Sequence, residues 1–207
     1  RAVAENMLQY QKDMALSMAN TQAIRPNVIN AIQEADVDKL YSLGKSLLAT
    51  NEVNIVVFTD TKGNVLARGH VPDRGDNIYN QHLLQQALAD NPVSGIEKGA
   101  KVGLSIRAAS PVKKDGVIIG AIIIGKNFFS DNRFVDGIKA SVGVEATVFL
   151  GDTRLITTIS KDGKRIIGTK LDNQAIITAV LDNGEIFNHR NRVFGQDYST
   201  VYWPLKD

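Results

Sequence analysis

Two pairs of polar residues stand inside apolar stretches of this sequence, and their types and spacing suit the binding of an anion. One residue separates Arg68 from His70, and one separates Ser105 from Arg107. Because side chains on a strand alternate between its two faces, the members of each pair share a face. A guanidinium presents a rigid fork of donors that matches a carboxylate, and a nearby imidazole or hydroxyl adds hydrogen bonds. We therefore expect one pocket for a small carboxylate beneath residues 71–79.

The same residues also have plainer interpretations. An arginine on a strand is often a solvated or ion-paired surface residue. His70, between Gly69 and Pro72, is equally typical of a loop histidine hydrogen-bonded to the backbone, although its titration near neutral pH could make binding depend on pH. Tyr79 and Lys98 are weaker candidates for the same pocket, Tyr79 as a lid contact and Lys98 as an extra cation.

Enzymatic chemistry has little support in the sequence. The chain has no cysteine and only three histidines, which excludes thiolate chemistry and argues against a zinc site. It lacks the nucleophile elbow of hydrolases, the His-Glu-x-x-His helix, a phosphate-binding loop and an EF-hand loop. A net charge of +2, from 24 basic and 22 acidic residues without runs of like sign, argues against nucleic-acid binding. We expect no catalytic residue, no metal and no cofactor.

Hydrophobic periodicity predicts the elements that would hold the candidate residues in place. Pro26 in a first turn and Asp36 as an N-cap indicate helix starts, and Asp76 or Asn77 would cap a later helix. An Asp-Gly pair at Asp115 marks a hairpin. The expected elements are helices at 1–20, 27–34, 36–50 and 78–90, and strands at 54–59, 64–68, 102–112 and 117–125.

This order of elements nearly repeats from residue 130 onward. The predicted elements there are helices at 130–140 and 173–181, strands at 144–150 and 154–159, a short strand near 166, and further strands within 184–205. Each module is a sheet with helices to one side, so the fold class is α+β. The second copy ends where the first has one more strand, which would leave a sheet edge open. We therefore expect a second module truncated at its last strand, cut from a longer protein shortly before a membrane segment.

The predicted domains are a long helical segment at 1–50 that packs on both modules, a first module at 51–129 and a second module at 130–207. On the first helix Met7, Met14 and Met18 recur at helical spacing and indicate a core or dimer contact. Four charged residues around turns of the second module are typical of a surface ion-pair cluster. They are Asp152, Arg154, Lys164 and Arg165.

The chain resembles the double-Cache sensor domains, a PAS-like family found in the periplasmic part of bacterial methyl-accepting chemotaxis proteins and related sensor kinases. The resemblance covers nearly the whole chain and rests on the order of several motifs, none of them decisive alone. They are 65–70 leading into 74–78, then 103–112 and 116–120, and in the second module 147–154, 157–158, 164–165 and 168–169.

This resemblance implies a membrane-distal module that binds a small ligand, a smaller membrane-proximal module, a transmembrane helix on each side, and a homodimer in the full-length receptor. Sensor kinases for citrate and C4-dicarboxylates bear a similar arginine and histidine after the first hairpin strand and a second arginine on a later strand. By that resemblance Arg68, His70 and Arg107 are the main ligand residues, with one residue between Arg68 and His70 where those kinases have two.

Some alternatives stay open at this point. The domain could belong to a chemoreceptor or to a histidine kinase or another transmembrane signalling protein, or it could be a dimerisation or interaction module whose pocket is vestigial. One cationic pair suits a monocarboxylate such as acetate or propionate, whereas three cations with Lys98 would suit a dicarboxylate. The sequence favours the smaller ligand.

Overall fold

This computed structural model describes residues 1–193 and 195–205, and the chain divides into two compact units. The first unit comprises residues 6–127, and the second comprises residues 1–5 with the described residues from Phe128 onward. Phe194, Lys206 and Asp207, which the predicted second module includes, lie outside the described residues.

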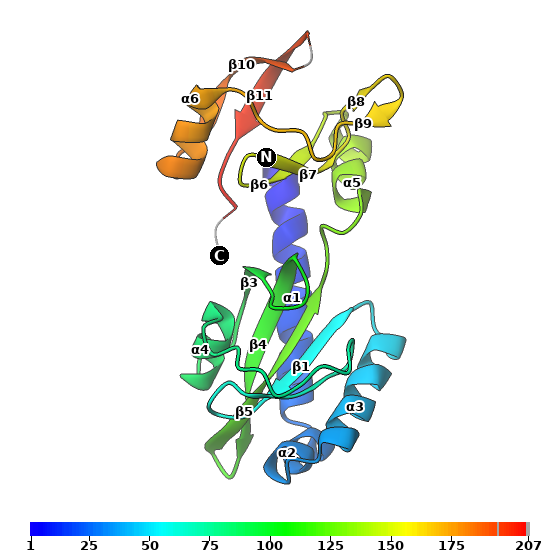
Figure 1. Cartoon of the computed structure of the whole chain (residues 1–207), viewed down its shortest axis with the longest axis vertical. Helices are drawn as coiled ribbons and strands as arrows, with labels where there is room; N and C mark the ends of the chain where they lie inside the picture. The colour runs from blue at the N-terminus through cyan, green and yellow to red at the C-terminus, as the bar shows by residue number, and fades with distance from the viewer. Residues whose placement is uncertain (194, 206–207) are drawn as a thin grey trace. The chain divides into compact units, whose positions relative to one another are not determined.

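The first unit contains most of the first helix and one antiparallel sheet of five strands (Figure 1). The strand order is β2-β1-β5-β4-β3, so the two longest strands, β4 and β5, pair beside the short hairpin of β1 and β2. The elements are α1 (Ala2–Ala23), α2 (Pro26–Gln33), α3 (Val37–Thr50), β1 (Ile55–Thr59), β2 (Val65–Arg68), α4 (His82–Leu88), β3 (Val93–Lys98), β4 (Leu104–Lys114) and β5 (Val117–Lys126).

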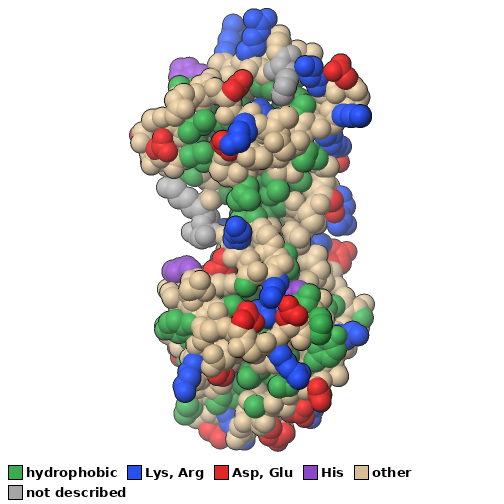
Figure 2. All heavy atoms as spheres, in the orientation of Figure 1, with side chains coloured by type: hydrophobic (Ala, Val, Ile, Leu, Met, Phe, Trp, Pro, Cys, Tyr) green, Lys and Arg blue, Asp and Glu red, His purple; other side chains and the backbone are tan. Residues whose placement is uncertain are grey.

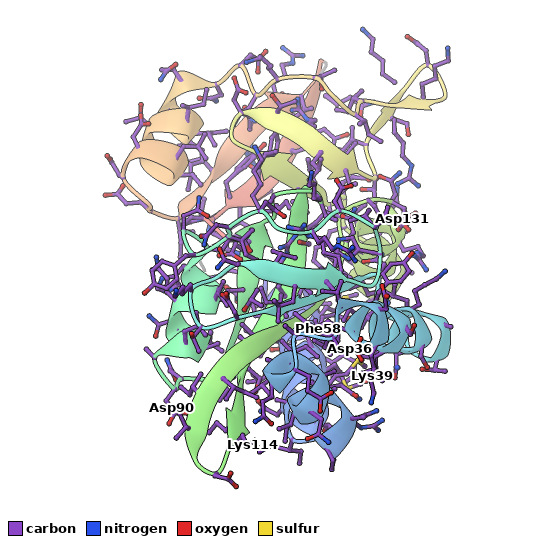
Figure 3. All side chains as sticks on the ribbon, turned by 60° about the horizontal axis from the view of Figure 1, so that its bottom comes forward. Asp36, Lys39, Phe58, Asp90, Lys114 and Asp131 are labelled. Carbon is purple, nitrogen blue, oxygen red and sulfur yellow. The ribbon has the colours of Figure 1, made fainter. Side chains whose placement is uncertain are left out.

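The sheet buries both of its faces, which is why the central strands β1 and β5 are largely apolar. On one face Val56 and Phe58 pack with the helices α1 to α3, and Figure 3 shows Phe58 directed toward these helices. On the opposite face Ile55, Val57 and Ile123 pack with α4. The alternation of β1 between these two clusters fixes which polar residues of the neighbouring strands share a face. This second face, on the α4 side, is called the α4 face below.

The helices begin and end close to the predicted positions, with one exception. Asp36 caps α3 as expected, because its Oδ1 accepts a hydrogen bond of 3.0 Å from the Lys39 amide (Figure 3). The prediction that Asp76 or Asn77 caps the next helix is wrong, since α4 begins only at His82 and its N-cap is Gln81. The carboxylate of Asp76 has a different partner, described below.

Helix α1 buries a stripe of mostly small residues. Leu8, Ala15 and Ala19 are buried, and small side chains let the helix approach the sheet closely. Met18 packs partly against the same cluster, whereas Met14 remains exposed. The homodimer through this helix therefore stays a prediction.

The second unit consists of short elements that form three two-stranded ladders, β6 with β7, β8 with β9, and β10 with β11. A small apolar cluster around Leu171, Ile176 and Val180 packs beneath Phe149 and Tyr202. The elements are α5 (Arg133–Val142), β6 (Thr147–Leu150), β7 (Thr153–Thr157), β8 (Ser160–Lys161), β9 (Lys164–Arg165), α6 (Gln174–Ile177), a π-helical turn (Thr178–Asp182), β10 (Phe187–Val193) and β11 (Gln196–Tyr202).

The α+β fold class is confirmed, with a long N-terminal helix followed by an antiparallel sheet. The additional last strand expected for the second module stays a prediction. Among the described residues, none of the helices combines the length and the apolar character needed to span a bilayer.

Candidate functional site

The sheet register places Arg68 and Arg107 on the same face. Arg68 is paired with Val57, and Val57 is paired with Ile123 on the next strand. Ile123 is in turn paired with Ala109, two residues after Arg107 on β4. Directly paired residues and residues two apart share a face, so both arginines lie on the α4 face. Their backbones are three strand spacings apart, about 14 Å, a span that two long side chains can reduce greatly.

Arg107 is a buried cation that the protein itself leaves largely uncompensated. Its side chain is 3% exposed, its Nε donates to Ser105 Oγ at 2.7 Å, and its Nη2 lies 3.5 Å from Val102 O. A guanidinium has five N–H donors. In the described part of the chain only these two donors meet an acceptor, and no carboxylate lies within ion-pair distance of the group.

Ser105 fixes the orientation of Arg107. The fully buried Ser105 hydroxyl donates to Glu97 O at 3.2 Å and accepts from Arg107 Nε, so its proton position is determined. Burial lowers the pKa of Arg107, Glu97 opposes this effect and Arg68 adds to it. The group nevertheless stays charged, because arginine does not lose its proton in proteins. A desolvated cation with unused donors is the arrangement that an anionic ligand would complete.

Two glycines make the room that Arg107 occupies. A Cβ added at Gly99, in the loop after β3, would lie 1.6 Å from Arg107 Nη2. A Cβ added at Gly125, which is paired with Arg107 on β5, would lie 2.9 Å from its Cγ. Glycine inside a strand commonly marks a place where another group approaches the backbone closely.

Arg68 differs from Arg107 because it already holds a carboxylate. Its Nη1 and Nη2 donate to Asp76 Oδ1 and Oδ2 at 2.7 and 2.8 Å, and Nη1 also donates to Asp73 O at 3.0 Å. The hydrogen bond from Arg68 lowers the pKa of Asp76. Asp73 Oδ2 lies 2.9 Å from Lys101 Nζ, which connects this loop to the loop after β3. Arg68 thus ties the segment 73–76 to the end of β2.

The pocket described in this unit adjoins Arg68 rather than Arg107. It has a volume of about 210 Å³ and lies between α3 and the segment that follows β2, at the edge of the sheet. Arg74 also lines it and lies 3.9 Å from Asp38 Oδ1. The lining residues are Val37, Asp38, Tyr41, Ala67, Arg68, Pro72 and Arg74.

His70 lies at the point where β2 has ended and interacts with backbone. Its Nδ1 is 3.3 Å from Val56 O and 3.4 Å from Val56 N, so the tautomer decides which contact is a hydrogen bond. Burial lowers the pKa of His70, the Val56 backbone opposes this, and the charges of Arg68 and Arg107 lower it further. The histidine therefore lies within the field of both arginines, although its ring nitrogen already has a partner.

Tyr79 and Lys98 are not brought to Arg107. Tyr79 is exposed, and its backbone lies against Gly63 in the β1–β2 turn, at the other end of the hairpin from His70. Lys98 is paired with Leu104, one position beyond the pair that contains Ser105, so it points to the opposite face of the sheet.

The charged residues of the second unit differ in part from the predicted surface cluster. Lys170 pairs with Asp152, and Arg165 pairs with Asp136, as exposed ion pairs. Arg154, in contrast, is buried, donates to Lys170 O at 2.8 Å and lies 5.1 Å above the Phe149 ring. No cluster of metal-ligating side chains occurs in the residues described, 1–193 and 195–205.

Residues 126–207 match the family Single cache domain 3. None of the curated proteins matches this chain. Among solved structures, the sensor domain of E. coli DcuS is similar over 64% of this chain and 97% of its own length, with 18% identity and a TM-score of 0.55. The sensor domain of the V. cholerae histidine kinase DctB is similar over 76% of this chain, with 12% identity and a TM-score of 0.60. This chain spans 65% of that DctB domain.

The ligand-binding domain of the Pseudomonas fluorescens chemoreceptor CtaA, solved with L-serine, is similar over 95% of this chain and 82% of its own length. Its identity is 14% and its TM-score is 0.53. Likeness at such identities shows a shared fold. The chain therefore has the fold of sensor domains from histidine kinases and chemoreceptors, and its C-terminal part matches a Cache family.

Three features of the site were not predicted from the sequence. Strand β3 was missed, although its pairing with β4 supplies Glu97 O to Ser105. Asp76 was expected as a helix cap and instead holds Arg68. Gly125 carried a usable signal, because a glycine inside a strand can mark a place where another group approaches the backbone closely, whereas the contact of Gly99 with Arg107 shows only in the structure.

Proposed function

We propose that this chain is the extracytoplasmic sensor domain of a transmembrane chemoreceptor and that its first unit binds a small organic anion, a carboxylate. The observation that carries the proposal is Arg107, a buried guanidinium with unused donors and no carboxylate partner among the residues described. A buried cation of this kind costs folding free energy unless something compensates it. A ligand carboxylate would supply that compensation.

The fold supports a sensor rather than an enzyme. Sensor domains of histidine kinases and chemoreceptors share it, and in the described residues nothing gathers metal-ligating side chains. The chemoreceptor domain is similar over 95% of the chain, which favours two modules on one long helix. On the face shown in Figure 2, basic and acidic side chains are interspersed, which fits a small ligand better than a polyanion.

The proposal assigns roles to the residues of the α4 face. Arg107 binds the carboxylate, Ser105 holds the guanidinium in position, and Arg68 adds positive potential. His70, whose pKa is lowered, is neutral near pH 7 and can offer its second ring nitrogen for a hydrogen bond. Binding biases the receptor only as far as the ligand prefers one arrangement of the domain, and a tenfold preference corresponds to about 1.4 kcal/mol. We further propose that the second unit is a membrane-proximal Cache module, and that the receptor is a homodimer.

A thermal-shift screen tests the proposed function. The acids are acetate, propionate, lactate, pyruvate, succinate, malate, fumarate and citrate, with L-serine included because amino acids also present a carboxylate. A ligand present at 100 times its Kd stabilises the folded protein by about 2.7 kcal/mol, which is a readily measured rise in melting temperature. If none of these compounds raises the melting temperature, the sensor proposal fails and the dimerisation or interaction module is favoured.

A further inference from the structure

The two arginines of the α4 face, Arg68 and Arg107, differ in whether a carboxylate of the chain is bound to them. Both side chains are 3% exposed. Arg107 has no carboxylate partner in the described residues, whereas both terminal nitrogens of Arg68 are bonded to one carboxylate, that of Asp76. This fork-to-fork geometry is the one by which arginine grips a carboxylate ligand.

We infer that Asp76 is an internal occupant of the anion position on Arg68, and that a ligand carboxylate reaching Arg68 has to displace it. The inference rests on the proposed function, because it concerns how that ligand is admitted. It makes Asp76 a residue that sets affinity by competition, without any contact to the bound ligand.

The surroundings of Asp76 allow such an exchange. The Asp76 side chain is 40% exposed while Arg68 is buried, so the carboxylate can leave into water and the cation cannot. Residues 72–75 of the preceding segment are exposed, and a Cβ added at Gly75, whose φ is +84°, would meet no atom within 4 Å, so the side chains of this stretch have room to move. The pocket of about 210 Å³ opens beside Arg68, which gives an anion access to it.

Two features prevent the pair from being a plain structural bridge. A fixed bridge would be expected to satisfy both partners fully, yet the Asp76 side chain is 40% exposed, and within residues 1–193 and 195–205 its carboxylate is hydrogen-bonded to Arg68 alone. The second carboxylate of the segment, Asp73, is held separately by Lys101. The segment thus stays attached when the Asp76 carboxylate leaves Arg68, because the Gly75 amide also donates to Val65 O at 2.9 Å and the Val65 amide donates to Asp76 O at 2.9 Å.

Calorimetric titration of the parent chain and of Asp76→Asn with succinate and with propionate tests the inference. Succinate carries a second carboxylate that is available to Arg68 when the first binds Arg107, whereas propionate carries one. Removing the competitor is expected to tighten succinate binding roughly tenfold, equivalent to about 1.4 kcal/mol. Asp73→Asn removes the same charge from the same segment but leaves Arg68 occupied, so it is expected to change succinate binding by less than about threefold.

The outcomes separate the two proposals. Tighter succinate binding in Asp76→Asn alone, or binding seen only in that variant, supports the internal occupant. Unchanged or weaker binding in Asp76→Asn, or equal effects of both variants, overturns it and leaves the carboxylate sensor intact. Propionate binding without any succinate binding in either protein also overturns it. If neither acid binds any of the three proteins, the internal-occupant inference fails, and the proposed function fails with it only if the thermal-shift screen is also without effect. Asp76→Ser replaces Asp76→Asn if the latter does not fold, as judged by its melting curve.

Discussion

Replacing Arg107 by methionine removes the guanidinium while keeping a flexible apolar side chain of similar volume in the space beside Gly99 and Gly125. In the parent chain the unused donors of Arg107 can form two charge-assisted bonds to a carboxylate. Hydrogen bonds to charged groups contribute about 1.5 to 3 kcal/mol each. Losing two of them is expected to cost at least about 3 kcal/mol, which weakens ligand binding roughly 150-fold.

The same substitution is expected to leave the fold intact. Arg107 has no ion pair to lose in the described residues, and exchanging a buried ionic group for an apolar one of similar volume is often neutral or stabilising. We expect the free energy of unfolding to change by less than about 1 kcal/mol. Urea denaturation of the unliganded proteins measures this change, and it separates a lost contact from an unfolded domain.

Isothermal titration with the acid that gives the largest thermal shift measures the loss of affinity. Lys98→Ala is the matched control, because it also removes one cation from the end of the same sheet but from its opposite face. The reasoning is refuted if Arg107→Met folds normally and binds within about threefold of the parent, or if Lys98→Ala loses as much affinity as Arg107→Met.

Two further predictions concern the neighbours of Arg107. Gly99→Ala places a Cβ 1.6 Å from the present position of Arg107 Nη2, so it should displace the guanidinium and weaken ligand binding at least tenfold. Gly103→Ala is the control, because its added Cβ has open space around it, and it should bind the ligand normally in the same titration. Because the folded pKa of His70 lies below its unfolded value of about 6.5, the unfolded chain binds an extra proton below that pH, and stability should fall as pH drops through 6.5. Urea denaturation measures the free energy of unfolding at pH 7.5 and at pH 5.5. The change in this free energy between the two pH values should be smaller for His70→Gln than for the parent and for the exposed control His82→Gln. Equal changes in all three proteins would exclude His70 as the cause.

The sequence was sufficient for the parts of the site that depend on strand periodicity. Ser105 and Arg107 share a face because they are two apart on β4, and their side chains meet at 2.7 Å. The hairpin that carries Arg107 was predicted from its Asp-Gly turn, where Asp115 and Gly116 both have positive φ. These features follow from local backbone geometry, so neighbouring residues determine them.

Features that depend on contacts across the fold were not predictable in the same way. Asp76 carries the sequence signal of a helix cap, but its partner Arg68 is on the preceding strand and outcompetes the amides of a helix start. Strand β3 follows a proline and contains Gly95, so local signals favoured a loop there, whereas pairing with β4 makes it a strand. Arg154 looked like a surface charge because the ring of Phe149, which covers it, belongs to another strand.

The unequal states of the two arginines also bear on the size of the ligand. A monocarboxylate needs only Arg107, which has unused donors and no ion pair among the described residues, so its binding breaks no existing ion pair. A dicarboxylate that also reaches Arg68 exchanges the bond to Asp76 for a bond of the same type, so its second carboxylate adds little net free energy. If Arg107 and Arg68 act as proposed, the parent chain should favour small monocarboxylates over their dicarboxylate counterparts, and Asp76 would be the residue that enforces this preference.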